Sequence, residues 1–142
     1  MCREAMRELA RRIHVQQGAA LIIDYGYLGE AHHDTLQAVK GHAFHPVLKD
    51  PGEADITAHV DFTTLMNLAH AEEVTVHGLT TQGRFLVNLG ADLRLEALLR
   101  RAHPEQKDAL ISGVTRLISP QAMGELFKVM AITSRAYSPS GF

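Results

Sequence analysis

The stretch GAALIIDYGYLG, residues 18–29, decides the fold. Four consecutive apolar residues, 20–23, run directly into an acid, two tyrosines and two glycines. The apolar run predicts a strand over Gly18–Ile23 that is buried on both faces, as strands of parallel sheets are. The polar end has two interpretations, because Asp and Gly terminate strands and form turns, while ligands of open α/β sheets bind outside the carboxyl ends of the strands.

Helical and extended patterns alternate along the rest of the chain. Extended patterns predict strands at ADITAHV, EVTVHGL and LFKVMAIT, and a short strand in TLQAVKGH within a polar, His-rich loop. The predicted helices cover residues 3–16, a segment capped by Asp61, TTQGRFLVNLG, residues 93–102 and 104–117, and a short segment from Ser119 onward. This order is typical of an α/β layered fold.

The composition limits the class of protein. The 142 residues carry a net charge of −2, so no basic surface for nucleic acid or anionic membranes is predicted. No apolar run reaches the roughly 20 residues of a membrane span, and the first residues do not resemble a signal peptide. Together with the single cysteine, Cys2, these features predict a cytoplasmic domain over residues 1–135 and a disordered tail over 136–142.

The chain lacks the glycine-rich turn of a complete nucleotide site. Neither G-x-G-x-x-G nor a Walker pattern occurs, and YGYLG has only two glycines with no clear helix behind it. The three clearest strands are also fewer than the about five or six of an average sheet. The pattern therefore indicates half of an α/β domain.

Four motifs follow one another along the chain, namely GAALIIDYGY, DTLQAVKGHAFHPVLKDPGEADITAHVDF, TTQGRFLVNLG and MGELFKVMAI. Together they resemble the C-terminal half of the MidA family of S-adenosylmethionine-dependent methyltransferases, relatives of the mitochondrial arginine methyltransferase that assists complex I assembly. The resemblance implies strands five to seven of a Rossmann-like class I methyltransferase sheet, with the last strand antiparallel. It also implies an inserted His-rich loop or β-hairpin and a helical segment before the last strand, so residues 1–135 would be the C-terminal part of a methyltransferase domain.

The resemblance further implies how the chain works. The family's glycine-rich cofactor loop and its Asn-Glu-Phe-Phe-Asp-type segment precede the first motif, so we expect the substrate-side half of a protein (arginine) methyltransferase, inactive alone. S-adenosylmethionine would be the cofactor of the intact enzyme and would not bind this chain by itself. The expected partners are a protein substrate, with a respiratory complex I subunit as one candidate, and a separately encoded N-terminal half. An exposed strand edge predicts self-association.

The polar end of GAALIIDYGYLG supplies the candidate catalytic residues, Asp24 and Tyr25. A carboxylate pairs with a planar guanidinium, and aromatic rings pack against it. The candidate substrate-binding residues are Tyr27, His59, Asp61 and Gln82. The structural interpretations are strand-end hydrogen bonding for Asp24, packing for the tyrosines, helix capping for Asp61 and Gln82, and a buried hydrogen bond for His59. Gly83 would allow a close backbone approach.

Two other functions stay open. His32, His33, His42, His45 and the His59–Asp61 pair lie in one stretch, which makes a small metal-dependent hydrolase the first alternative. No H-E-x-x-H or similar signature supports it, and no metal ligand is assigned. A non-catalytic partner-binding module is the second alternative. Near the C-terminus, Phe127 is predicted to be a core residue.

Overall fold

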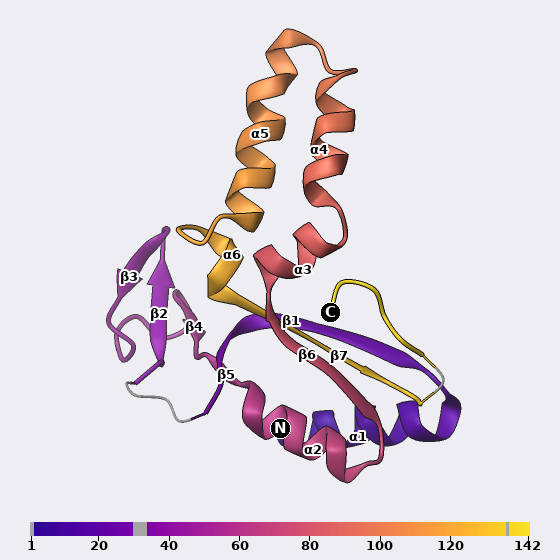
Figure 1. Ribbon diagram of the computed structural model, residues 1–142. Coiled ribbons are helices and arrows are strands. Elements are labelled where there is room, and N and C mark those ends of the chain that lie inside the picture. Colours follow the sequence, from indigo (N-terminus) through magenta and orange to yellow (C-terminus); the bar gives the residue numbers. More distant parts are fainter. Residues whose placement is uncertain (1, 30–33, 136) are drawn as a thin grey trace.

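The structure, a computed structural model, describes residues 2–29, 34–135 and 137–142. Its centre is a four-stranded sheet with the order β5-β1-β7-β6 (Figure 1). The strands are β1 (Ala19–Tyr27), β5 (Val60–Asp61), β6 (Thr75–Thr81) and β7 (Phe127–Thr133). β7 runs antiparallel to both β1 and β6. The α/β class and the antiparallel last strand are therefore confirmed.

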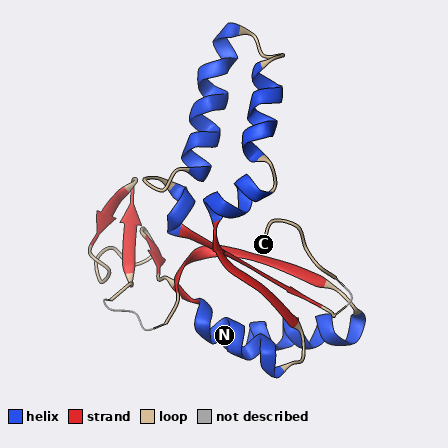
Figure 2. Cartoon of the chain, viewed as in Figure 1, coloured by secondary structure: helices blue, strands red, loops and turns tan. Residues whose placement is uncertain are grey.

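Two helices cover one face of this sheet. α1 (Cys2–Gln16) and α2 (Phe62–Ala71) lie side by side against the strands, as Figure 2 shows. The hydrophobic core fills the space between these helices and the sheet, and Phe62, Met130 and Ile132 have no exposed surface there. The apolar stripes of α1 and α2 are thus buried on the sheet.

The opposite face of β1 is open. Leu21 and Ile23 keep 51% and 42% of their surface exposed, because successive strand residues point to opposite faces and only one face carries helices. One edge of β1 is open as well, since β5 pairs only with Gly26 and Tyr27 and no other described strand joins that edge. The prediction that this strand is buried on both faces is wrong for the described chain.

β1 continues through the polar residues that follow the apolar run. It ends at Tyr27 rather than at Ile23, so the sequence DYGY is part of the strand. Gly26 permits this arrangement, because a side chain there would overlap the Phe62 ring and would lie 2.6 Å from the carbonyl oxygen of Val60. The glycine lets β5 and the start of α2 pack directly on the strand.

Replacing Gly26 with alanine should destabilise the fold, because overpacking typically costs about 1–3 kcal/mol. Gly113→Ala is the matched control, since Gly113 lies in helix α5 (Pro104–Ile118) with open space around its Cβ position. Alanine is favoured over glycine in a helix interior by about 1 kcal/mol. Urea unfolding should show a loss for Gly26→Ala and a gain for Gly113→Ala. An unchanged stability of Gly26→Ala would contradict the packing of Phe62 on β1.

A second, three-stranded sheet stands beside the carboxyl end of β1 (Figure 1). Its strands are β2 (Gln37–Lys40), β3 (Ala43–His45) and β4 (Asp55–Thr57), in the order β3-β2-β4. Ionic contacts hold the loop between β3 and β4, with Lys40 Nζ 2.6 Å from Glu53 Oε2 and 3.2 Å from Asp50 Oδ2. The predicted insertion is therefore a folded β unit. The single strand predicted at ADITAHV is instead divided between β4 and β5, which belong to different sheets.

A helical segment precedes β7, as predicted. It contains α3 (Gln82–Asn88), α4 (Ala91–Leu99), α5 and α6 (Met123–Leu126). α4 and α5 form a pair that projects away from the sheet (Figure 1), and neither has a buried residue. No helix in the described ranges is long and apolar enough to cross a membrane.

The base of this helical segment contains one confirmed and one wrong prediction. A Cβ atom on Gly83 would lie 3.2 Å from the Cα atom of Gly124, so the predicted close approach at Gly83 is confirmed. The helix predicted from Ser119 onward begins only at Met123. Ser119 ends α5 instead, and its hydroxyl donates to Gln121 Oε1. The residue before α6 is Ala122, which has no side-chain hydrogen bond to cap the helix.

Residues 137–142, part of the segment that the sequence suggests is disordered, lie against β6 and α3. The Phe142 ring centroid is 5.1 Å from that of Phe85 and 6.3 Å from that of His77. Asn88 Nδ2 donates to the Gly141 carbonyl, and the Thr133 hydroxyl donates to the Tyr137 carbonyl. These contacts cover the second face of the sheet near β6 but leave Leu21 and Ile23 on β1 exposed.

Candidate functional site

Three rings meet at the carboxyl end of β1. The Tyr25 ring centroid lies 6.3 Å from that of His59, with the planes 17° apart, and 4.1 Å from that of Phe127, with the planes 34° apart. All three residues are half-buried. We call Tyr25, His59 and Phe127 the aromatic row. The structure thus brings together two predicted site residues, Tyr25 and His59, and adds Phe127, which the sequence assigned to the core.

Asp24 and Tyr25 point to opposite faces of the sheet. The register pairs Asp24 with Lys128 and Tyr25 with Phe127, and the two members of such a pair share a face. Asp24 Oδ1 accepts a hydrogen bond from the backbone N–H of Tyr25 at 2.8 Å, as its structural interpretation required. The hypothesis that Asp24 and Tyr25 hold one guanidinium together requires both side chains on one face, which a regular strand does not provide.

Asp61 ends β5 and caps helix α2. Its Oδ1 atom accepts a hydrogen bond from the backbone N–H of Thr64 at 3.1 Å, and its other carboxylate oxygen accepts one from the Thr64 hydroxyl. The Thr64 hydroxyl bond lowers the pKa of Asp61 below its usual value, because it stabilises the carboxylate, and burial opposes this effect. Asp61 is therefore an ionised helix cap at neutral pH.

Replacing Asp61 with alanine should destabilise the chain in a pH-dependent way. Loss of an N-cap costs about 0.5–2 kcal/mol at neutral pH. Because the pKa of Asp61 is lower in the folded chain than in the unfolded chain, the charged cap stabilises the fold above the unfolded pKa. That contribution is lost as the pH falls through the folded pKa. Urea unfolding should therefore show the deficit of Asp61→Ala shrinking in acid.

Thr81 provides the control for this prediction, because it caps α3 without a charge. Its Oγ1 atom accepts a hydrogen bond from the backbone N–H of Arg84 at 3.4 Å. The deficit of Thr81→Ala should be the same at neutral and acid pH. A deficit of Asp61→Ala that is equally independent of pH would contradict the assigned pKa.

The remaining predicted residues have separate surroundings. Tyr27 ends β1 and pairs with Asp61 across the short parallel ladder to β5. Gln82 is only 8% exposed, and its Nε2 atom donates to the Leu117 carbonyl at 2.9 Å. This bond holds α3 against the end of α5. It engages the side-chain amide that the sequence analysis predicted to bind the substrate.

The histidines do not form a metal centre in the part of the chain that the structure describes. No group of three or more His, Cys, Asp or Glu side chains lies close enough there to hold a metal ion. His59 and Asp61 line one shallow depression with Arg3 beside helix α1. His32 and His33 lie outside the described residues.

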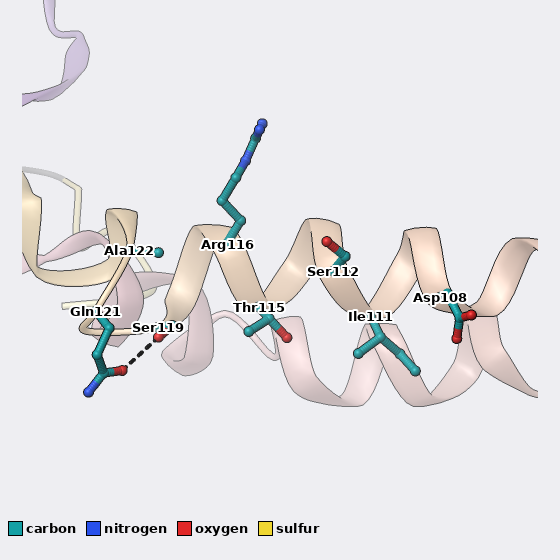
Figure 3. Close-up of a pocket in the computed structure, with 8 residues that line it drawn as sticks. All are labelled: Asp108, Ile111, Ser112, Thr115, Arg116, Ser119, Gln121 and Ala122. Atoms are coloured by element: carbon teal, nitrogen blue, oxygen red, sulfur yellow. Dashed lines mark hydrogen bonds between the residues drawn. The ribbon is translucent and has the colours of Figure 1, made fainter. Parts of the chain in front are cut away.

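Another depression lies on the outer side of α5. Figure 3 shows that its side chains come from this one helix and the turn behind it, and Ser119 donates to Gln121 there at 2.8 Å. None of its lining residues belongs to the predicted site. The aromatic row therefore remains the place where separate elements bring predicted residues together.

Comparison with known proteins gives the family. Residues 1–80 match a family described as S-adenosyl-L-methionine-dependent methyltransferase. The chain belongs to this methyltransferase family. It is 42% identical over 139 residues to the mitochondrial protein arginine methyltransferase NDUFAF7 of Danio rerio, covering 96% of this chain and 32% of the relative. It is 44% identical over 128 residues to the same protein of Mus musculus, covering 89% and 29%.

The methyltransferase fold is also seen in a solved structure. A crystal structure of a protein from Burkholderia thailandensis bound to S-adenosyl-homocysteine matches 98% of this chain and 37% of that chain, with a TM-score of 0.84 and 29% identity. The resemblance to the MidA family and the predicted methyltransferase fold are confirmed. This chain spans about a third of the length of the proteins it matches.

The predicted cytoplasmic localisation is wrong by the same comparisons. The relatives from Danio rerio, Mus musculus and Homo sapiens are all named as mitochondrial proteins. The prediction rested on the single cysteine, on the absence of a long apolar run and on first residues that do not resemble a signal peptide. Neither feature distinguishes the cytosol from a mitochondrial compartment.

Proposed function

We propose that this methyltransferase chain forms the substrate-side part of a protein arginine methyltransferase. The observation that carries the proposal is the half-buried aromatic row at the carboxyl end of β1, where ligands of α/β sheets bind. The 42% identity to an arginine methyltransferase supports a guanidinium as the acceptor. The protein substrate would be mitochondrial, and a respiratory complex I subunit stays one candidate.

The methyl donor requires more than the described chain. S-adenosylmethionine supplies an electrophilic methyl group when it is bound. A cofactor of this nucleotide type needs an open glycine-rich turn between a strand and a helix. Among the described residues, the element that follows β1 is the strand β2 and not a helix, and Gly83, at the turn from β6 to α3, packs against the Ile118 carbonyl. The described residues therefore do not fit the donor. We assign the donor site to the part of the relatives that this chain does not span.

The chain's own contribution is to bind and orient the acceptor side chain. Aromatic faces hold a planar cation flat, and alignment of the attacking nitrogen with the donor supplies much of the rate of a transfer reaction. We assign this contact to Tyr25 and His59, with Tyr27 beside them. We assign structural roles to Asp24, Asp61 and Gln82, and their hydrogen bonds support this assignment.

A chimaera tests this proposal. The chain should replace the matching 139 residues of the Danio rerio relative, and the product should be incubated with S-adenosylmethionine and a mitochondrial protein extract. We expect new methylarginine by mass spectrometry. Tyr25→Ala should reduce its formation by about tenfold or more, because the acceptor is no longer positioned.

Tyr137→Ala is the control for the chimaera, because Tyr137 is 53% exposed on the C-terminal tail. It should leave methylation unchanged. A folded chimaera that binds S-adenosyl-homocysteine but forms no methylarginine would contradict the proposed function. That outcome would favour a non-catalytic partner-binding module.

A further inference from the structure

The aromatic row has features that would distinguish between cationic side chains. We propose that Tyr25, His59 and Phe127 form a guanidinium-binding surface that selects arginine over lysine, with Phe127 as a specificity-determining residue. The inference rests on the proposed function. It adds that the chain distinguishes arginine from lysine, and that Phe127 makes this distinction.

Phe127 is held beside Tyr25 by the backbone. The two residues are directly opposite each other in the antiparallel ladder of β1 and β7, which explains the ring separation of 4.1 Å. His59 continues the row from the other side, and its own backbone N–H donates to Thr35 Oγ1 at 3.3 Å. The row is thus assembled from three separate parts of the chain.

The exposure of Phe127 is not what a core residue shows. Residues 129–133 of the same strand are buried, whereas Phe127 is half-buried. Tyr25 is half-buried too. The accessible ring surface therefore begins where the strand pair reaches the carboxyl end of β1. Packing of the hydrophobic core alone does not require aromatic residues at this accessible position.

The lysine that follows Phe127 on β7, Lys128, does not lie on the same face as the aromatic row. In the strand register Lys128 is opposite Asp24, and both side chains lie on the other face of the sheet. The Lys128 ammonium group donates to the Glu125 carbonyl. On the His59 side, Arg3 and Asp61 line the same depression, and the Arg3 charge acts on the Asp61 carboxylate. An incoming cation would therefore meet ring faces.

Ring faces favour a guanidinium over an ammonium group. The guanidinium is planar and weakly hydrated, so it stacks on aromatic rings with little loss of hydration. The lysine ammonium is compact and strongly hydrated, and its donors seek oxygen acceptors. Since Asp24 is on the other face and Asp61 is engaged with Thr64, the row offers mainly π surface.

Titration of the chain with two small probes tests the inference. N-acetyl-arginine-methylamide and N-acetyl-lysine-methylamide are added to the chain with 13C-labelled aromatic rings, and the ring resonances are followed by NMR. We expect saturable shifts of Tyr25, His59 and Phe127 with the arginine probe. The lysine probe should bind about threefold or more weakly, as expected for a cation–π contact on a partly exposed surface.

Substitutions make the assignment specific. Phe127→Leu should lower the affinity for the arginine probe about threefold and leave the lysine probe unchanged. Phe44→Leu is the matched control, because Phe44 is 83% exposed on β3. If Phe127→Leu does not fold, as judged by its melting transition, Tyr25→Leu takes its place with the same expected result.

Two outcomes would overturn the inference. They are equal binding of the two probes, and unchanged arginine affinity in a folded row variant. Both readouts concern acceptor binding by this chain without a methyl donor. They are therefore distinguishable from a failure of the proposed function, which is detected as missing methylarginine in a chimaera that binds S-adenosyl-homocysteine.

Discussion

The isolated chain should self-associate, and its mass in sedimentation experiments should rise with concentration above the 15.6 kDa of one copy. The reason is the open edge of β1. Apart from Gly26 and Tyr27, which pair with β5, that edge has no partner strand among the described residues. Strand edges are protected from association by lysine, by proline or by a bulge, and the sequence of β1, AALIIDYGY, has neither lysine nor proline.

The open face of β1 adds to this tendency. Leu21 and Ile23 are 51% and 42% exposed and lie on one face of the strand. Burial of apolar surface contributes about 25 cal/mol per Å² of area removed from water. A partner strand with a covering element would therefore remove the unpaired backbone and the exposed side chains from water together.

Substitutions distinguish association through β1 from non-specific hydrophobic association. Ile23→Lys should lower the association, because a charged side chain on an edge strand opposes pairing with another chain. Leu93→Lys should not, although Leu93 is 65% exposed, because it lies on α4. A cooperative monomer at high concentration would show that β1 has no open edge, and equal effects of the two lysines would show that association occurs elsewhere.

The sequence predicts the order of elements because each depends on local patterns. The amphipathic spacing of α1, the Asp61 cap of α2 and the β-branched residues of β6 all act within a few residues. The antiparallel direction of the last strand, β7, came from the family resemblance, and local pattern alone would not have shown it. The length of β1 was underestimated because Asp and Gly are poor strand residues. The contact of Phe62 with Gly26, 36 positions along the chain, overrides that preference.

The candidate site was predicted less completely, for a related reason. Tyr25 and His59 could be proposed individually, but their contact depends on how the chain returns through β4 and β5. Phe127 could have been found by aligning the antiparallel strands β1 and β7, because that alignment places it opposite Tyr25. The same alternation would have separated Asp24 from Tyr25. The sequence could not decide between the structural and the substrate-binding interpretation of Gln82, because the partner of this residue, the Leu117 carbonyl, lies 35 positions away.

Binding of the methyl donor should differ strongly between the isolated chain and the chimaera. We expect S-adenosyl-homocysteine to bind the chimaera with the Danio rerio relative and not the isolated chain. The isolated chain spans about a third of that relative. Its described strand-to-helix turns offer no open glycine-rich loop, because Gly83 is packed against the Ile118 carbonyl. Donor contacts in folds of this kind come mainly from such a loop and from the helix that follows it.

Calorimetric titration of S-adenosyl-homocysteine into the isolated chain tests the central claim most directly. The chimaera serves as the positive control, and circular dichroism shows that both proteins are folded. We predict no heat of binding for the folded chain and a saturable, one-to-one signal for the chimaera. Micromolar binding to the isolated chain would show that it holds the donor by itself, and would contradict the assignment of this chain to the substrate side alone.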